Sequence, residues 1–456
     1  MKKRLILSLL TSVYCLMLTG FPFQAIAEES QANPVLEEDP FAISEDDMFS
    51  DSETVESVEE YQDEKIAHEA DSSSFGISGE VKGIFQYNKA RETSDPSANI
   101  EDSYTADLET NFLLDARLGY GLKFFSDVLI SYSALEETGN NQRQSEEEDE
   151  EDYEIVVREI FGDLNIMKKV YFRAGKQTLK WGQGYFWNPT DLINKERKDI
   201  QNVEARREGT YGLKMHVPFG TNLNIYSFID ITDAETSDDY ALAGKLEFLI
   251  LNNVEVSFSS WNKKDFQAVY GFDISTYQFE MQWRSELSLT KGGNQHRLEE
   301  QDGMYVDTYD EDKWISQFVF GFTRRFDIGD ISDRLSLTGE FFYNENGYDE
   351  NMFEDPRVRA QFLAGGYYIP NQYGKTYAAV FSSFSRFLNV SDLTLNVNTI
   401  GNLSDSSYLL ETSLNYEIDF DTSITANLTN YLGEENREYT LSGNASSAKV
   451  SITRGF

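Results

Sequence analysis

The sequence has almost no cysteine, and the single one, Cys15, lies in the first 27 residues. Those residues match a secretory signal peptide: a basic start at Lys2–Arg4, an apolar run over Leu5–Leu18, and the small-residue motif Ala25-Ile26-Ala27. Tyr14 argues against a lipoprotein, because a small residue is expected before a lipidated cysteine. We expect cleavage before Glu28, which leaves a mature chain that folds in an oxidising compartment without disulfides.

Long apolar runs and basic patches are also lacking. No run of about 18 apolar residues follows the signal peptide, which excludes a helical membrane span. The net charge is -40 and becomes -43 once the three basic residues of the signal are removed, so a nucleic-acid partner is not expected. Aromatic residues are abundant, with 26 Tyr and 32 Phe, as suits the interface girdles of a membrane protein.

Motifs for catalysis, cofactors and metals are missing as well. The chain has three histidines, His68, His216 and His296, and no nucleophile elbow, zinc-protease motif or phosphate-binding loop. We therefore predict no catalytic residues, no cofactor and no metal site. A surface enzyme that uses His216 or His296 stays as an alternative.

Residues 28–74 form the next region, and nearly all of their charge is acidic. Over residues 28–72 there are 17 acidic residues and one basic residue, Lys65, with apolar residues at no fixed period. This composition predicts a disordered periplasmic leader. A recruiting motif within it is the alternative.

From residue 75 to 456 the pattern changes to period-two alternation, most clearly in segments 106–118, 278–289 and 407–418. In the second segment, for example, Phe279, Met281 and Trp283 alternate with polar residues. These strands run for about 11 to 13 residues, enough to cross a bilayer at a tilt, whereas soluble strands average about 5 or 6. Their polar faces carry charges that a sandwich core could not bury but a watery lumen accepts.

We expect about 18 such strands, with 16 possible because segments 254–274 and 422–445 alternate weakly. The expected strands begin near residues 76, 104, 123, 154, 170, 210, 222, 240, 254, 267, 277, 314, 333, 376, 392, 407, 422 and 439. Short connections, one of them at Ser275–Thr276, alternate with long loops at 89–103, 136–153, 181–209, 290–312 and 345–375. This predicts an all-β fold: a transmembrane antiparallel β-barrel with short periplasmic turns and long extracellular loops.

The last strand ends on an aromatic residue, Phe456, preceded by the alternating apolar residues Ile452, Val450 and Ala448. This resembles the carboxy-terminal strand that outer-membrane barrels present to their assembly machinery. Arg454 departs from that pattern, and near the membrane interface it can snorkel at modest cost. The resemblance implies that Phe456 is an assembly signal.

Segment 158–194 resembles the Gram-negative outer-membrane porin superfamily, near porin-like families of unknown substrate. The similarity rests on Gly175-Lys176-Gln177 at the end of a strand, then Trp181-Gly182 and Asn188-Pro189-Thr190-Asp191 in the following loop. It covers under a tenth of the chain and implies no particular solute. In porins the third external loop folds inward, so the resemblance implies that residues 181–209 narrow the channel, with an external lid as the alternative.

The residues of that loop favour a folded segment. Asn188, Pro189 and Asp191 suit the start of a short helix, and Trp181, Tyr185, Phe186 and Trp187 could anchor the loop to the wall. Residues 171–216 carry nine basic and five acidic residues, which favours anions or a mixed-charge constriction. The predicted pore-constriction residues are Trp181, Trp187, Asp191, Lys195, Arg197, Lys198, Arg206 and Arg207. The predicted lumen-facing basic residues are Arg117, Arg173, Lys214 and Arg284.

Together these features predict an outer-membrane porin-like channel for passive diffusion of small hydrophilic solutes. The alternative is a structural or adhesive barrel with a plugged lumen. Expected partners are outer-membrane lipid and lipopolysaccharide, the barrel assembly machinery and a small hydrophilic solute, and further copies of the chain are a candidate partner. The acidic run Glu146–Asp152 predicts a solvated loop, or one bridged to lipopolysaccharide by divalent cations.

Overall fold

The computed structural model describes residues 74–92, 101–118, 121–138 and 153–456, apart from residues 192, 194–197, 201, 202, 204, 252, 293, 295, 303 and 309–311. Backbone contacts separate Met1–Ser72 from Ser73–Phe456, and the described residues all belong to the second unit. The predicted signal peptide, the leader before Ser74, the acidic run Glu146–Asp152, Lys195 and Arg197 lie outside the described residues.

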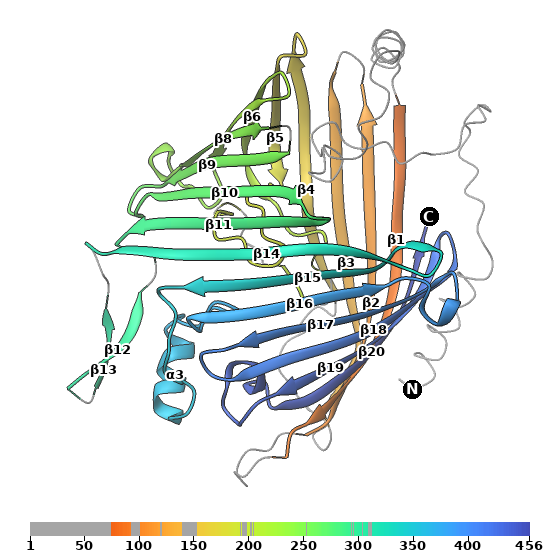
Figure 1. Ribbon diagram of the computed structural model, residues 1–456, viewed down its shortest axis with the longest axis vertical. Coiled ribbons are helices and arrows are strands. Elements are labelled where there is room, and N and C mark those ends of the chain that lie inside the picture. Colours follow the sequence, from red (N-terminus) through yellow and green to blue (C-terminus); the bar gives the residue numbers. More distant parts are fainter. Residues whose placement is uncertain are drawn as a thin grey trace. The chain divides into compact units, whose positions relative to one another are not determined.

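Eighteen antiparallel strands form one closed sheet (Figure 1). The first eleven are β1 (Ser74–Ala90), β2 (Ser103–Arg117), β3 (Lys123–Thr138), β4 (Tyr153–Ile166), β5 (Val170–Gln177), β6 (Thr210–Phe219), β7 (Leu223–Asp230), β8 (Ala241–Ile250), β9 (Val254–Asn262), β10 (Val269–Gln278) and β11 (Met281–Lys291). The other seven are β14 (Trp314–Ile328), β15 (Ile331–Asn344), β16 (Thr376–Phe384), β17 (Leu393–Asn402), β18 (Ser407–Asp419), β19 (Thr422–Leu432) and β20 (Asn444–Gly455).

Each barrel strand pairs with its neighbours in sequence, and β20 closes the barrel by pairing with β1 from Glu80↔Gly455 to Ala90↔Asn444. Between β11 and β14 a separate hairpin, β12 (Arg297–Gln301) and β13 (Met304–Thr308), stands outside the sheet. Among the described residues the other elements are α3 (Pro356–Ala364) and the short 3-10 helices η1 (Ser237–Asp239), η2 (Phe387–Asn389) and η3 (Glu438–Thr440). No helix within the described residues is long and apolar enough to cross a membrane.

The two faces of the barrel follow from the alternation in sequence. Apolar residues such as Phe75 and Ile77 on β1 are exposed on the outer face, at 68% and 64%. Alternate residues point inward, where Glu286 on β11 and Glu411 on β18 are 0% and 1% exposed. The alternation predicted for segments 106–118 and 407–418 is confirmed in β2 and β18, and that of segment 278–289 is confirmed from Met281 onward in β11. An apolar outer belt of this kind suits a lipid environment.

The predicted count of eighteen strands is confirmed, and the alternative of sixteen is wrong. Two predicted boundaries were also wrong. Ser275 and Thr276 continue β10, and the turn falls at Phe279 and Glu280, whose φ angles are +58° and +57°. Neither is the glycine or asparagine that usually marks such a turn. A strand expected from residue 439 begins at Asn444 instead, because η3 occupies Glu438–Thr440.

Among the described residues, buried apolar side chains gather in three clusters rather than one core. One joins inward-facing residues of β14–β18 to Phe186 and Trp187, and another joins Trp181 to β7 and β8. The third lies in the external loops, where residues from 345–375, including Val358 and Phe362 of α3, pack with Leu298 of β12. The loop between β5 and β6, loop 178–209, contributes to the first two clusters.

Candidate functional site

Loop 178–209 is bonded to the carboxylate of Glu286, an inward-facing residue of β11. Glu286 Oε2 accepts from Thr190 Oγ1 at 2.9 Å and from the Thr190 amide at 3.2 Å. Its Oε1 accepts from the Gly184 amide and, at 3.1 Å, from Asn188 Nδ2. A carboxylate buried in this way requires donors around it, and the loop supplies four.

A second carboxylate, Glu340 on β15, binds the next part of the loop. It accepts three consecutive backbone amides, from Tyr185 at 2.6 Å, Phe186 at 3.0 Å and Trp187 at 2.8 Å. Glu255 on β9 adds a third attachment, where its Oε1 accepts from Gln183 Nε2 at 2.7 Å. Residues 183–190 are thus held by inward-facing carboxylates of three strands.

The predicted helix at Asn188 is wrong, because the described residues 188–191 form a turn, with the Asp191 amide donating to the Asn188 carbonyl at 3.1 Å. A helix-capping asparagine would accept backbone amides through its side chain. Asn188 instead donates to Gly184 O at 2.7 Å, and Glu286 accepts the Thr190 amide. Glu286, from the distant strand β11, therefore accepts the backbone amide that a local helix N-cap would have accepted.

Gly182 fits the backbone shape that this anchoring requires. Its φ is +99°, and an added Cβ would lie 2.6 Å from both Glu286 Oε1 and Thr190 Oγ1. A side chain here would meet both backbone strain and the anchoring carboxylate. The glycine thus allows the loop to approach β11 closely.

Aromatic rings of the loop pack against the inner wall. Trp187 stacks on Phe342 of β15, with ring centroids 5.5 Å apart, and Phe186 and Tyr185 contact Phe381 of β16. Trp181 is buried with Phe228 and Ala243. Aromatic pairs of this geometry add to the area that they bury.

The basic residues predicted at the constriction are mostly engaged by the protein itself. Lys198 Nζ donates to the carbonyls of Gly184 and Tyr185 at 2.9 and 2.6 Å. Burial lowers the pKa of the Lys198 amine to about 8, although Glu340 and Glu286 oppose this. Arg207 pairs with Asp191 at 3.5 Å, and Arg206 pairs with Asp127 of β3 at 3.3 Å. Of these three, Arg206 has the most exposed side chain, at 51%.

The four predicted lumen-facing residues all lie on inward positions of their strands. Arg173 is buried and binds both oxygens of Asp163, at 2.7 and 3.0 Å. Arg284 donates to Gln282 at 3.2 Å and lies over the Tyr185 ring. Arg117 lies 3.7 Å from Asp115, and Lys214 lies over the Tyr226 ring.

The sequence did not predict the polar junction at Asn371, where loop 178–209, loop 345–375 and η3 meet. Its carbonyl oxygen accepts the Trp187 indole N–H at 2.8 Å, and its amide donates to Glu438 Oε1 at 2.8 Å. Glu438 Oε2 also accepts from Tyr377 and Asn402, both at 2.8 Å. The only signal in the sequence was an acidic residue beside the aromatic Tyr439 in a weakly alternating region.

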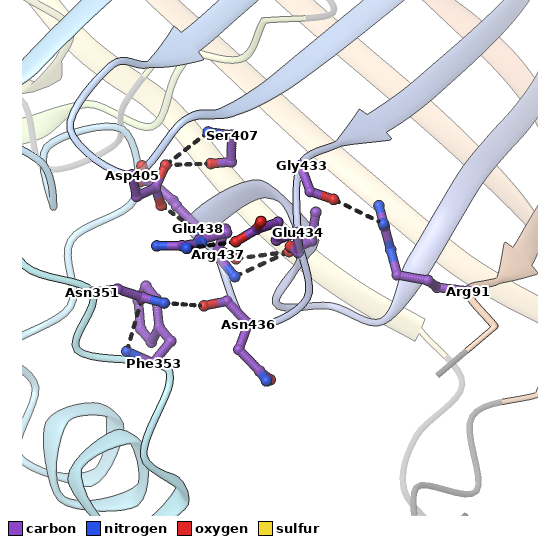
Figure 2. A network of polar contacts seen from close by, with 11 residues as sticks. Arg91, Asn351, Phe353, Asp405, Ser407, Gly433, Glu434, Asn436, Arg437 and Glu438 are labelled. Carbon is purple, nitrogen blue, oxygen red and sulfur yellow. Dashed lines mark hydrogen bonds and ion pairs between the residues drawn. The ribbon is translucent and has the colours of Figure 1, made fainter. Parts of the chain in front are cut away.

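Figure 2 shows how this junction continues across the external loops. The Glu438 amide donates to Asp405 Oδ2 at 2.8 Å, and Asp405 Oδ1 accepts from the amide and hydroxyl of Ser407. Asn351 reaches the Asn436 carbonyl at 2.9 Å, and Arg91 reaches the Gly433 carbonyl at 3.1 Å. Four external segments are therefore linked by polar contacts.

The two described histidines lie apart from this site. His216 stacks on Tyr226 with centroids 4.4 Å apart and lies 3.0 Å from Asn224 Oδ1. His296 is exposed and lies 3.0 Å from Asp307. Among the described residues no group of three or more His, Cys, Asp or Glu side chains is placed to hold a metal ion.

Comparison with known proteins rests on structure alone, because no protein-family model and no curated protein matches the chain. OpdL from Pseudomonas aeruginosa matches with a TM-score of 0.52 at 10% identity, over 84% of this chain and 99% of its own. OccK5 (OpdH) from the same species matches with 0.51 at 9% identity, over 84% and 98%. A BenF-like porin from Pseudomonas fluorescens Pf-5 matches with 0.51 at 11% identity, also over 84% and 98%.

The chain has the outer-membrane porin fold. The resemblance to porins drawn from segment 158–194 is thus confirmed at the level of fold, and such a barrel resides in the bacterial outer membrane. Identities of 9 to 11% carry no residue roles across. Within this porin fold, loop 178–209 is the third of the long loops in chain order.

Proposed function

We propose that this protein is a porin-like channel through which small hydrophilic solutes diffuse, and that loop 178–209 narrows its lumen. The observation that carries the proposal is the bonding of one loop to Glu286 and Glu340. The loop leaves the wall at β5, whereas these carboxylates face inward from β11 and β15. A loop bonded in this way lies across the path of a solute.

Arg206 and Asp127 support a mixed-charge constriction. Their ion pair joins the far end of the loop to β3, on the other side of β5. Lys198 contacts a backbone carbonyl of the loop, and Arg207 forms an ion pair with Asp191. These two charges therefore stabilise the conformation of the loop. Selection by charge then depends on Arg206 and Asp127, together with the predicted contributions of Lys195 and Arg197.

The test is single-channel recording in planar bilayers with the full mature protein and with Glu286→Ala/Glu340→Ala. The wild type should give discrete conductance steps, and the variant should give larger and noisier ones because the loop loses its acceptors. Glu417→Ala, on an exposed inward position of β18, is the control. If the Glu286/Glu340 variant and the wild type give conductance steps of equal size, loop 178–209 does not narrow the lumen. If folded wild-type protein gives no steps, the protein is not a channel.

A structural or adhesive barrel with a plugged lumen is the second candidate. The apolar cluster of the external loops favours it, because Phe353, Phe362 and Tyr373 give these loops a core of their own. A folded external surface of this kind can present a binding face. The same recordings separate the two functions, since a plugged barrel gives no conductance.

A further inference from the structure

Another part of the inner wall, on strands other than those of the loop's anchoring carboxylates, is rich in amides and hydroxyls. We name it the polar wall: the inward-facing residues of β17–β20, β1 and β2. Strand register aligns these residues in rows that run across six strands. One row is Asn396, Ser413, Asn427, Lys449, Gln86 and Thr105.

The neighbouring rows have the same character. On one side the row is Asn398, Glu411, Thr429, Ser447, Asn88 and Ser103. On the other side it is Thr394, Asn415, Thr425, Ser451, Ile84 and Asp107. In these three rows the formal charges are Glu411, Lys449 and Asp107, and the remaining positions except Ile84 are neutral and polar.

The two acidic residues of these three rows, Glu411 and Asp107, are hydrogen-bonded to side chains of the barrel. Glu411 accepts from Asn427 Nδ2 at 2.8 Å and from Asn398 Nδ2 at 3.3 Å. Asp107 accepts from Ser133 Oγ at 2.8 Å, and Lys82 in an adjacent row pairs with Glu109 at 3.2 Å. An ion that loses hydration water here would meet few unpaired charges of opposite sign. Its desolvation free energy would therefore not be compensated.

A neutral solute with many hydroxyls fits this surface better. Each hydroxyl both donates and accepts, and each asparagine side chain offers both functions. Asn396, Asn398, Asn415 and Asn427 are all partly exposed, and their hydrogen bonds to Ser413, Glu411 and Thr425 use only some of their donors and acceptors. The adjoining strands β14–β16 are unlike this, because their inward residues Val319, Phe342 and Tyr377 pack with Phe186 and Trp187.

We propose that the channel's solutes are neutral and polyhydroxylated, such as monosaccharides and polyols, and that they pass along the polar wall. This rests on the proposed channel function and adds the substrate class. The wall exchanges hydrogen bonds with the hydroxyls of the solute as water is removed. Binding is weak at each row, and the repeated rows let a solute move from one to the next.

Efflux from proteoliposomes of the full mature protein tests the substrate class. Glucose, glucosamine and glucuronate have the same ring and differ in charge, so each is loaded and its initial efflux rate measured. Glucose should leave faster than glucuronate by at least about fivefold, the factor for one hydrogen bond. It should also leave faster than glucosamine.

If glucosamine or glucuronate leaves faster than glucose, the proposed substrate class is wrong, although the protein is still a channel. No efflux of any solute, together with no conductance steps, would overturn the channel itself. The two failures are therefore distinguishable.

The polar wall is tested by Asn396→Leu/Asn427→Leu, with Asn430→Leu as the matched control. Asn430 lies on the same strand as Asn427 but faces outward, between Leu428 and Leu432. The double variant should lose about fivefold or more in glucose efflux, and the control should keep it. Equal glucose rates in all three proteins would overturn the role of the wall. If the double variant fails to fold, the single change Asn396→Leu is judged by the same criterion.

Discussion

Trp187 donates its indole N–H to the backbone carbonyl of Asn371 at 2.8 Å, which joins loop 178–209 to the external loop 345–375. Trp187→Phe keeps the ring stacked on Phe342 and removes only this donor. We expect the free energy of unfolding to fall by about 1 kcal/mol, as for one lost hydrogen bond. Denaturant unfolding in detergent micelles measures it. Trp314→Phe, on an exposed outer position, should change it far less.

Glu438 should make the external loops sensitive to pH. Burial raises the pKa of its carboxyl from 4.5 to about 7, and the nearby Asp405 carboxylate adds to the rise. The folded state therefore binds the proton more tightly than the unfolded chain, so this stabilisation is fully present below pH 4.5 and is lost as pH rises toward 7.

The measurement is the midpoint of thermal unfolding at pH 5 and pH 8, for the wild type and Glu438→Gln. The wild type should lose more stability at pH 8 than the variant, because glutamine does not titrate, and its one oxygen can still accept from Tyr377 and Asn402. An identical pH response in the two proteins would contradict this role for Glu438.

Gly182→Ala should loosen the loop through both backbone strain and contact with Glu286. We expect a loss of about 2 kcal/mol or more in unfolding free energy, with noisier single-channel currents. Gly220→Ala separates the two causes, because Gly220 also has a positive φ, +66°, but nothing within 4 Å of its added Cβ. The contact explanation fails if both variants are equally destabilised.

Arg206→Gln should shift ion selectivity toward cations. The change leaves the buried carboxylate of Asp127 without its 3.3 Å ion pair, so the loop's end presents a net negative charge. Reversal potentials under a potassium chloride gradient report the shift. Arg454→Gln, on an outward position of β20, removes an equal charge and should leave the reversal potential unchanged.

Phe456→Ala should reduce the yield of folded barrel in the outer membrane. Phe456 exchanges backbone hydrogen bonds with Gly79 at 2.9 and 3.1 Å, and its ring lies edge-on to Phe112. The ring thus covers the seam between β20 and β1. Phe420→Ala is the control, since Phe420 is 97% exposed in a turn, and a similar drop in both variants would contradict a special role for the last residue.

The barrel was predictable because alternation is a local signal that tertiary contacts here reinforce. The strands expected near 254 and 422 alternate weakly because polar Ser260 and Asn430 stand at outward positions and aromatic Trp261 and Tyr431 at inward ones. The turn at Phe279 and Glu280 could not be predicted, since neither residue favours a positive φ by itself. Its position is set by the pairing of β10 with β11.

The candidate site was predictable only in part. The loop and its aromatic anchors follow from composition, and Glu286 stood on a predicted polar face. Glu340 was missed because Phe342, two residues later, also faces inward and breaks the alternation of β15. The local signal for a helix at Asn188 was overridden by a carboxylate 98 residues away, a contact that no local pattern reveals.

The anchoring carboxylates and the polar wall belong to different strands, β9, β11 and β15 against β17–β20, β1 and β2. Substitutions can therefore accumulate in the three rows of the polar wall without loosening the loop, whereas Ile400 and Leu409 on the same strands belong to the cluster that holds Phe186 and Trp187. Such a division makes solute preference and pore size separately evolvable. Related barrels could differ in the solutes that they import while keeping the same pore size. In this barrel, substitutions in a single row of the polar wall could change the solute preference.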